Sequence, residues 1–175
     1  MTTIRPRENP SRTAALVKSK GKKLLSQLAE WIKKVSEQNA GSVSCSTQLL
    51  QDGILCLAFE GYYPPGSEGT HVANEMVKYT LAAYNCHNPR ALLFDFEKLD
   101  YVWGDGVCLP AMYLGFERKE MPLSLPVCVL AHGRTHKALE GLFGNRNMCF
   151  GLVGARLFDD REKAMAYLEA ELYRT

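Results

Sequence analysis

The sequence predicts an α/β domain with a mixed, mostly parallel sheet of about five strands and helices packed on it, preceded by an amphipathic helix. Short apolar segments alternate with amphipathic ones along the chain, which is the order that β-α-β crossovers require. The central apolar run, residues 90–96, is typical of a strand buried on both faces. It leads to Gly104-Asp105-Gly106, a turn before a further apolar segment, and partners gather beyond the carboxyl ends of such strands.

The composition divides the chain into two parts. It has 175 residues, 46% of them hydrophobic, which is enough for one core and an appendage. The net charge is only +2, but residues 1–40 hold nine Lys and Arg against three Glu, whereas the remainder holds 12 basic and 16 acidic residues. We therefore expect a basic N-terminal extension over residues 1–40 and an α/β domain over residues 41–175.

The six cysteines lie far apart, without a Cys-x-x-Cys pair or a nearby His at metal-ligand spacing. Most of them stand in apolar runs, where cysteine behaves as a small hydrophobic residue. The first ten residues contain no apolar signal segment, and the longest nearly apolar run, residues 121–131, is too short to cross a bilayer. We expect a cytoplasmic protein without a metal or another cofactor. A mitochondrial transit peptide is the alternative, which Glu8 in the basic start disfavours.

An amphipathic helix is predicted from Arg12 to Gln38, followed by a linker at residues 39–42. Its apolar residues recur at spacings of three and four, and its lysines lie mainly off that stripe. Three roles stay open for this helix: packing on the domain or on its copy in a homodimer, binding to an anionic membrane surface, and binding to a partner protein. A homodimer would form through the stripe residues Leu25, Leu28, Ile32 and Val35.

The domain is predicted to begin with a hairpin. Residues 45–50 and 54–60 are strand candidates, and the Asp-Gly turn between them favours an antiparallel pair. Residues 61–66 are predicted to form a loop, because they contain two glycines and two prolines. Apolar residues recur at helical spacing over residues 67–84, which predicts the first helix of the domain.

The second half of the domain continues the alternation. A helix is predicted after Gly106, beginning either at Val107 or at Pro110, because proline suits the first helical position. The remaining predicted elements are a strand at 122–131, a helix at 135–143, a strand at 148–153 that could extend through 156–158, and a helix capped by Asp159 and Glu162 with Met165, Leu168 and Leu172 facing inward.

This order resembles the STAS domain of anti-sigma-factor antagonists and sulphate transporters, over about residues 44–175. In that family the central strand ends on Asp, continues through spaced apolar residues and reaches Asp-Ser-Ser/Thr-Gly, whose second hydroxyl residue is a phosphorylation switch. Asp95 here occupies the place of the first Asp, Leu99 and Val102 the places of the apolar spacers, and Gly106 that of the closing glycine.

The sequence departs from the family at the switch itself. Trp103 stands where the family has its second Asp, Gly104 replaces the first Ser, and Asp105 replaces the hydroxyl residue that would accept phosphate. A serine kinase cannot phosphorylate an aspartate, which supplies one fixed charge where phosphoserine supplies about −1.5 to −2. The resemblance therefore implies a bacterial regulatory module that acts by protein–protein interaction, with the switch lost or locked.

We expect the loop after the central strand, together with the following helix, to dock on a partner protein. In this interpretation Asp105 is a permanently anionic recognition residue and Trp103 is an apolar anchor. The alternatives are a turn or N-cap role for Asp105 and a core position for Trp103. The predicted binding residues are Trp103, Gly104, Asp105, Gly106 and Val107.

Two other functions remain open alternatives. A small cysteine-dependent hydrolase would use Cys108 as the nucleophile and His132 as the base, because both follow the carboxyl ends of predicted parallel strands. Asp105 or Asp95 would then orient the imidazole, although a cysteine between Val and Leu is also typical of an inert core position. A membrane-peripheral scaffold would instead bind through the basic helix.

Several other kinds of site are disfavoured. No histidine pair has the i, i+4 spacing with nearby acids that metal binding needs, and no glycine-rich phosphate loop is present. We expect no nucleic-acid binding, because the globular part is acidic and the basic helix lacks interleaved aromatic residues or a recognised motif. A non-catalytic interaction module is therefore the preferred function.

Overall fold

The computed structural model describes residues 43–119, 123–143 and 149–174. The predicted amphipathic helix with Leu25, Leu28, Ile32 and Val35 lies outside these residues, as does the predicted linker at 39–42. The roles proposed for that helix, the homodimer among them, therefore stay predictions.

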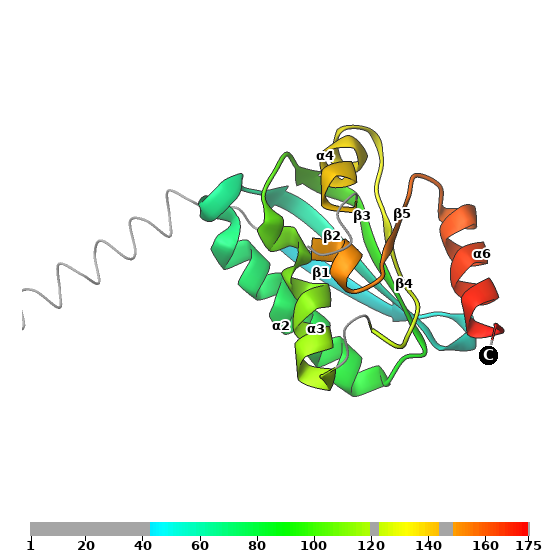
Figure 1. The fold of residues 1–175 in the computed structure, drawn as a ribbon. Helices are drawn as coiled ribbons and strands as arrows, with labels where there is room; N and C mark the ends of the chain where they lie inside the picture. Colours follow the sequence, from blue (N-terminus) through cyan, green and yellow to red (C-terminus); the bar gives the residue numbers. More distant parts are fainter. Residues whose placement is uncertain (1–42, 120–122, 144–148, 175) are drawn as a thin grey trace, which may run out of the picture. The chain divides into compact units, whose positions relative to one another are not determined.

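A single five-stranded sheet forms the centre of the domain, with its strands in sequential order (Figure 1). The first two strands are antiparallel, and each later strand is parallel to its predecessor, which confirms the predicted mixed, mostly parallel sheet. The strands are β1 (Val43–Leu49), β2 (Ile54–Tyr63), β3 (Ala91–Tyr101), β4 (Val127–Leu130) and β5 (Arg156–Phe158).

The predicted hairpin is present and turns through a short 3-10 segment, η1 (Gln51–Gly53). Asp52 has φ +59° and Gly53 has φ +78°, the left-handed conformation that Asp tolerates and Gly adopts freely. The Asp-Gly pair therefore accounts for the antiparallel start of an otherwise parallel sheet.

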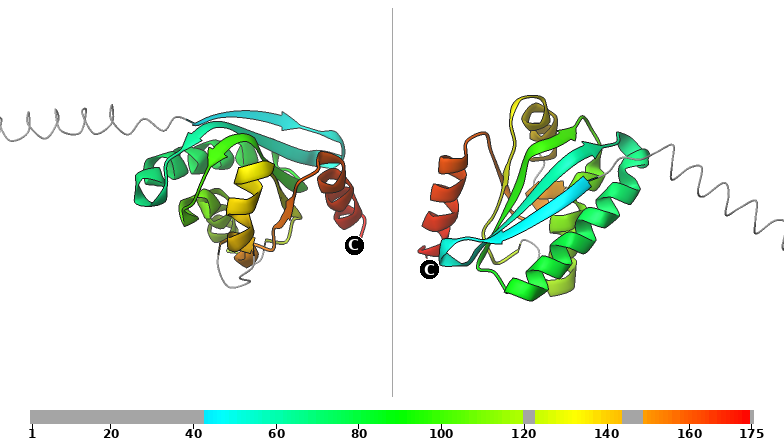
Figure 2. Two further views of the ribbon diagram at one scale, coloured as in Figure 1. Left: turned by 90° about the horizontal axis from the view of Figure 1, so that it is seen from above. Right: turned by 180° about the vertical axis from the view of Figure 1, so that it is seen from behind.

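Helices lie on both faces of the sheet, and the three interior strands, β2, β3 and β4, carry buried apolar residues on both faces for that reason. In Figure 2, α2 and α3 lie side by side below the β1–β2 hairpin, and α6 stands apart from them beside β4 and β5. The helices are α2 (Thr70–His87), α3 (Leu109–Arg118), α4 (Gly133–Phe143), the single turn α5 (Cys149–Leu152) and α6 (Arg161–Leu172).

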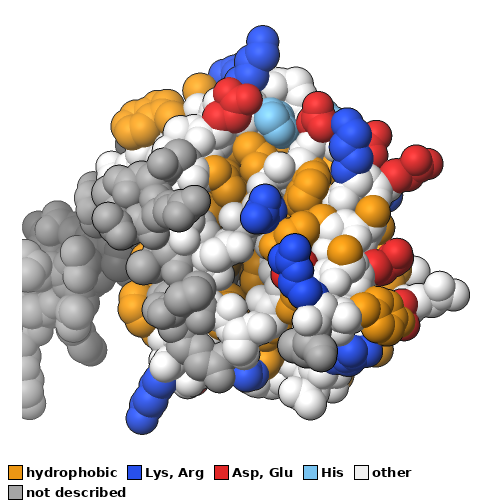
Figure 3. All heavy atoms as spheres, turned by 45° about the vertical axis from the view of Figure 1, so that its right-hand side comes forward, with side chains coloured by type: hydrophobic (Ala, Val, Ile, Leu, Met, Phe, Trp, Pro, Cys, Tyr) orange, Lys and Arg blue, Asp and Glu red, His pale blue; other side chains and the backbone are white. Residues whose placement is uncertain are grey.

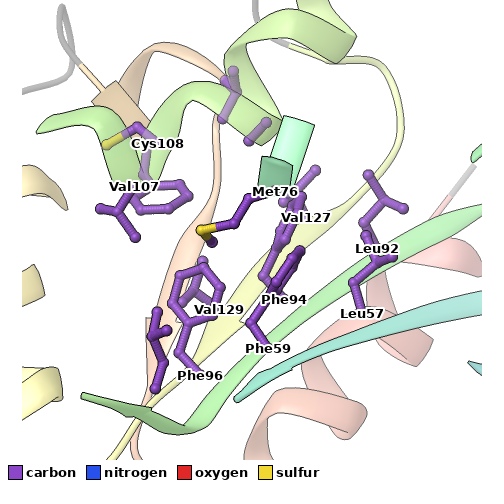
Figure 4. Packing of buried hydrophobic residues seen from close by; sticks show 14 of the residues in the cluster. Leu57, Phe59, Met76, Leu92, Phe94, Phe96, Val107, Cys108, Val127 and Val129 are labelled. Atoms are coloured by element: carbon purple, nitrogen blue, oxygen red, sulfur yellow. The ribbon is translucent and has the colours of Figure 1, made fainter. Parts of the chain in front are cut away.

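Alternate strand residues belong to two hydrophobic clusters. The larger cluster lies between the sheet and α2 to α5, and Figure 4 shows its packing around Phe94 and Met76. The smaller cluster lies between the sheet and α6, where Ala164, Leu168 and Leu172 are buried. The residues that alternate toward the larger cluster include Leu55, Leu57, Leu92, Phe94, Val127 and Val129, and those toward the smaller one Ile54, Cys56, Ala91, Leu93, Cys128 and Leu130.

Two predicted strand ends are wrong. β2 continues through Tyr63, so residues 61–63 are strand and not loop. β3 does not end after Phe96 but continues to Tyr101, because the segment after Asp95 keeps an apolar side toward the core. Leu99 and Tyr101 are buried, whereas Lys98 and Asp100 are exposed, which is the alternation of a strand with one covered face.

The predictions for the last third of the chain need three further corrections. β4 is confined to Val127–Leu130, shorter than the predicted strand at 122–131. Residues 149–152 form α5 and not a strand, since a short apolar run does not distinguish a buried helix from a strand. The N-cap of α6 is Asp160, whose carboxylate accepts the Lys163 N–H, and not Asp159.

Candidate functional site

The loop after β3 presents an exposed tryptophan. Trp103 is 61% exposed, so it is not a core residue. Asp105 is also exposed and begins the 3-10 segment η3 (Asp105–Cys108). The N-cap of η3 is Gly104, without a side-chain capping bond, so Asp105 does not act as an N-cap there. Val107 is completely buried and anchors the end of the loop in the core.

The loop is fixed by contacts with its own neighbours. The Gly66 N–H donates to the carbonyl oxygen of Trp103 over 3.3 Å, and the Tyr101 hydroxyl donates to the carbonyl oxygen of Gly104 over 2.7 Å. Gly104 has φ +129°, a conformation that other residues rarely adopt. Its backbone also lies close to that of Gly66, because an added β-carbon would approach the Gly66 nitrogen to 3.2 Å.

Tyr63 lies in the core, directly under Gly106 of the loop. Its side chain is completely buried, and a β-carbon at Gly106 would collide with its hydroxyl oxygen. The glycine at position 106 therefore allows η3 to approach the end of β2. Burial raises the pKa of the Tyr63 phenol above its ordinary value, with smaller contributions from Cys108 and Asp105.

The helix that follows the loop carries an exposed apolar stripe. Tyr113 and Phe116 are 43% and 57% exposed, and their ring centroids lie 6.3 Å apart in an edge-to-face arrangement. The opposite side of α3 is packed into the core through Ala111 and Leu114. We call the exposed residues Trp103, Asp105, Tyr113 and Phe116 the loop–α3 surface, whereas Leu109 and Met112 are half-buried and pack against the larger cluster.

Sequence reasoning missed this stripe, although its spacing is visible. Leu109, Met112, Tyr113 and Phe116 stand at i, i+3, i+4 and i+7, which places them along one side of a helix. The opposite side is apolar as well, so the pattern alone does not show which side meets the core.

The structure places Cys108 and His132 in different surroundings. The Cys108 thiol is completely buried beside Val107 in the larger cluster, as Figure 4 shows. The His132 side chain is 48% exposed, and its Nε2 lies 2.6 Å from Glu97 Oε1. A thiol without solvent contact is closed to a substrate, so this geometry does not favour the hydrolase alternative.

Asp95, the residue that matches the first Asp of the STAS motif, anchors α6. Its side chain is only 9% exposed and is paired with Arg161, the first residue of α6. The same guanidinium lies 2.6 Å from Glu97 Oε2. Asp95 also accepts the Glu97 N–H over 3.0 Å, so a closed set of contacts joins the middle of β3 to α6.

The contacts between Arg161 and Glu97 shift the pKa values of both groups. The pKa of Glu97 is lowered, chiefly by the hydrogen bond from Arg161, while partial burial opposes the shift. The pKa of Arg161 is raised for the corresponding reason, with the bond to Glu97 as the largest cause. These groups border a hollow of about 600 Å³ whose other walls come from β1 and β2.

Three further observations on the described residues concern metal binding, membrane crossing and the basic patch that nucleic-acid binding needs. Among residues 43–119, 123–143 and 149–174, no group of three or more His, Cys, Asp or Glu side chains is arranged to hold a metal ion. In the same part of the chain, no helix has the length and apolar character needed to cross a membrane. On the face drawn in Figure 3, Lys and Arg side chains are scattered among acidic and apolar ones and form no continuous basic patch.

No protein-family model matches the chain, and no curated protein matches it. The solved structures that are similar to it include two anti-sigma factor antagonists. One is the crystal structure of an anti-sigma factor antagonist from Mycobacterium paratuberculosis, with a TM-score of 0.50 and 14% identity over 73% of this chain and 95% of that chain. The other is the anti-sigma factor antagonist SpoIIAA in its unphosphorylated form, with a TM-score of 0.47 and 14% identity over 73% of this chain and 97% of that chain.

The first of these likenesses shows the fold. The domain has a STAS-like α/β fold, as the order of elements and the residues around Asp95 predicted.

Proposed function

We propose that this chain is a non-catalytic regulatory module that binds a protein partner through the loop–α3 surface. The observation that carries the proposal is the 61% exposed indole of Trp103 on a loop that is already fixed by backbone contacts. A large exposed aromatic side chain on a rigid support loses little entropy when it enters a pocket, and Trp is enriched among the residues that dominate binding energy.

The chemistry of the surface describes the partner. An apolar pocket would receive the Trp103 indole, and an apolar groove would cover Tyr113 and Phe116 on α3. A Lys or Arg of the partner would face the carboxylate of Asp105. The fold relative is named an anti-sigma factor antagonist, so the class of partner that we propose is a regulator of the anti-sigma factor kind.

Asp105 gives the proposed docking surface a permanent negative charge. It supplies its negative charge without a modification, and a kinase that acts on serine or threonine has no acceptor at this position. Regulation of this module would therefore depend on its abundance or on another site, and not on phosphorylation at the loop.

Affinity recovery from an extract of the source organism tests the proposal. The baits are the native chain, Trp103→Ala and Asp105→Ala, with bound proteins identified by mass spectrometry. Tyr173→Ala and Asp159→Ala are matched controls, because Tyr173 is a 69% exposed aromatic residue and Asp159 an exposed acid, both outside the loop–α3 surface. Thermal unfolding of each bait verifies that it is folded.

A partner that the native chain and both controls retain, and that both loop variants lose, would support the proposal. If the loop variants recover the same proteins as the native chain, the loop is not the docking site.

A further inference from the structure

The two edge strands of the sheet differ in how well they are protected from pairing with a strand of another chain. β5 forms one edge, has only three residues and begins with the exposed Arg156. β1 forms the other edge, where Figure 2 shows it along the outside of the sheet. β1 has seven residues and pairs with β2 from Val43 to Leu49 without a register shift. Within the part of the chain that the structure describes, β1 therefore offers a long, regular row of backbone donors and acceptors on its outer side.

β1 lacks the features that usually prevent an edge strand from pairing. Its sequence, Val-Ser-Cys-Ser-Thr-Gln-Leu, contains no charged residue, no proline and no glycine. The one register shift in the described sheet lies between β2 and β3, near Ala58 and Glu60, and the β1–β2 pair has none. Most side chains of β1 are exposed, and Leu49 is 46% exposed although it is apolar.

The strand is also complementary to itself. In an antiparallel pair centred on Ser46, Val43 of one copy lies opposite Leu49 of the other, and each Ser46 faces its own counterpart. The apolar ends cover each other and the polar residues meet in the middle. No like charges oppose each other, because the strand carries none.

We propose that β1 pairs with β1 of a second copy of this chain, antiparallel and around a two-fold axis at Ser46. The two sheets then form one continuous sheet across the dimer, and each copy contributes the same surface, as closed two-fold symmetry requires. The loop–α3 surface comes directly after the interior strand β3 along the chain and includes no residue of the edge strand β1. This proposal therefore does not depend on the proposed function.

Introduction of a charge at Ser46 tests the proposal on the full chain by sedimentation velocity at several concentrations. Ser46→Lys and Ser46→Glu each place two like charges face to face at the axis, so each variant alone is expected to dimerise at least about tenfold more weakly than the native chain. An equimolar mixture of the two variants is expected to regain dimers, because Lys then faces Glu. Gln51→Lys adds the same charge on the exposed hairpin turn outside β1 and should dimerise like the native chain.

The mixture keeps the test valid if one variant is less stable, because only folded chains with a competent β1 edge can regain dimers by mixing. A native chain that is monomeric at all concentrations overturns the proposal. Dimers of Ser46→Lys alone that are as strong as native ones also overturn it, because the dimer then uses another surface.

Discussion

The indole ring of Trp103 lies against Gly66, so close that a β-carbon at Gly66 would come within 2.6 Å of Cη2. Gly66 has φ +58°, in the left-handed region that residues with a side chain rarely adopt. Glycine at this position therefore does two things. It permits the turn that leads into η2 (Gly66–Gly69), and it leaves room for the exposed Trp103.

We predict that Gly66→Ala destabilises the domain and displaces Trp103. The left-handed backbone costs about 1–2 kcal/mol for a residue with a β-carbon, and the collision with the indole adds to that cost. Urea denaturation measures the loss of unfolding free energy. Fluorescence of Trp103 in a Trp31→Phe background, where it is the only tryptophan, reports its displacement.

Gly133→Ala is the matched control for this prediction. Gly133 has φ +53°, but apart from its chain neighbours and its own helix backbone no atom of the described residues lies within 4 Å of the place that its β-carbon would occupy. This variant should show the backbone cost alone and leave the Trp103 emission unchanged. Equal losses of stability in the two variants would show that the contact between Gly66 and Trp103 contributes nothing.

A double-mutant cycle at Tyr63 and Gly106 tests the support below the loop. Gly106→Ala should cost about 1–3 kcal/mol of unfolding free energy, because its β-carbon would collide with the Tyr63 hydroxyl oxygen. Within the described residues that hydroxyl has no hydrogen-bond partner, so Tyr63→Phe should be nearly neutral. In the double variant, the Tyr63→Phe change removes the colliding oxygen and should restore most of the loss. Additive effects in urea denaturation would contradict this account.

Much of the fold could be predicted from local patterns. The continuous apolar run of β3 and the Asp-Gly turn at Asp52 each specify a structure that depends on few distant residues. The errors arose where the outcome depends on tertiary packing. Phe150 stacks on Phe143 with ring centroids 4.8 Å apart, and this contact accompanies a helical turn where the sequence permits a strand.

The candidate site was predicted less completely than the fold. Trp103 and Asp105 could be selected because the loop follows a buried strand, where partners and ligands gather. Gly66 and Tyr63, which support that loop, lie about 40 residues earlier along the chain and carry no motif. Arg161 likewise pairs with Asp95 across 66 residues, and only the folded sheet brings these two side chains together.

Alkylation of the native protein distinguishes a buried Cys108 from a reactive one. Cys86 is exposed, whereas Cys108 is completely buried, so iodoacetamide at pH 7 should modify Cys86 before Cys108. Cys45 should react slowly, because burial raises its pKa to about 12 and leaves little thiolate. Peptide mass spectrometry over time measures the order. Modification of Cys108 as early as Cys86 would reopen the hydrolase alternative.

The Arg161 contacts predict a loss of stability when the guanidinium is removed. Arg161→Gln leaves the carboxylate of Asp95, which is only 9% exposed, without its charged partner. We expect a loss of about 1–3 kcal/mol of unfolding free energy at pH 7, toward the lower end because the Arg161 side chain is itself 47% exposed. Urea denaturation measures the change. A variant as stable as the native chain would show that this pairing does not hold α6.

The same contacts predict how stability changes in acid. The folded-state pKa of Glu97 lies below its ordinary value of 4.5, chiefly because Arg161 donates to it. The folded protein therefore holds the ionised form more strongly than the unfolded chain does. This contribution is fully present above pH 4.5 and is lost as the pH falls through the lowered pKa. Glu97→Gln should flatten that part of the stability curve between about pH 5 and pH 3.

Glu60→Gln is the control for the acid prediction. Glu60 pairs with Lys98 over 3.5 Å, but both side chains are more than 60% exposed, so the pair contributes little to stability. Its removal should leave the acid part of the curve unchanged, whereas Glu97→Gln alters it. If the two variants follow the same curve from about pH 3 to pH 7 in urea denaturation, the acid sensitivity of this domain arises elsewhere than at the contact between Glu97 and Arg161.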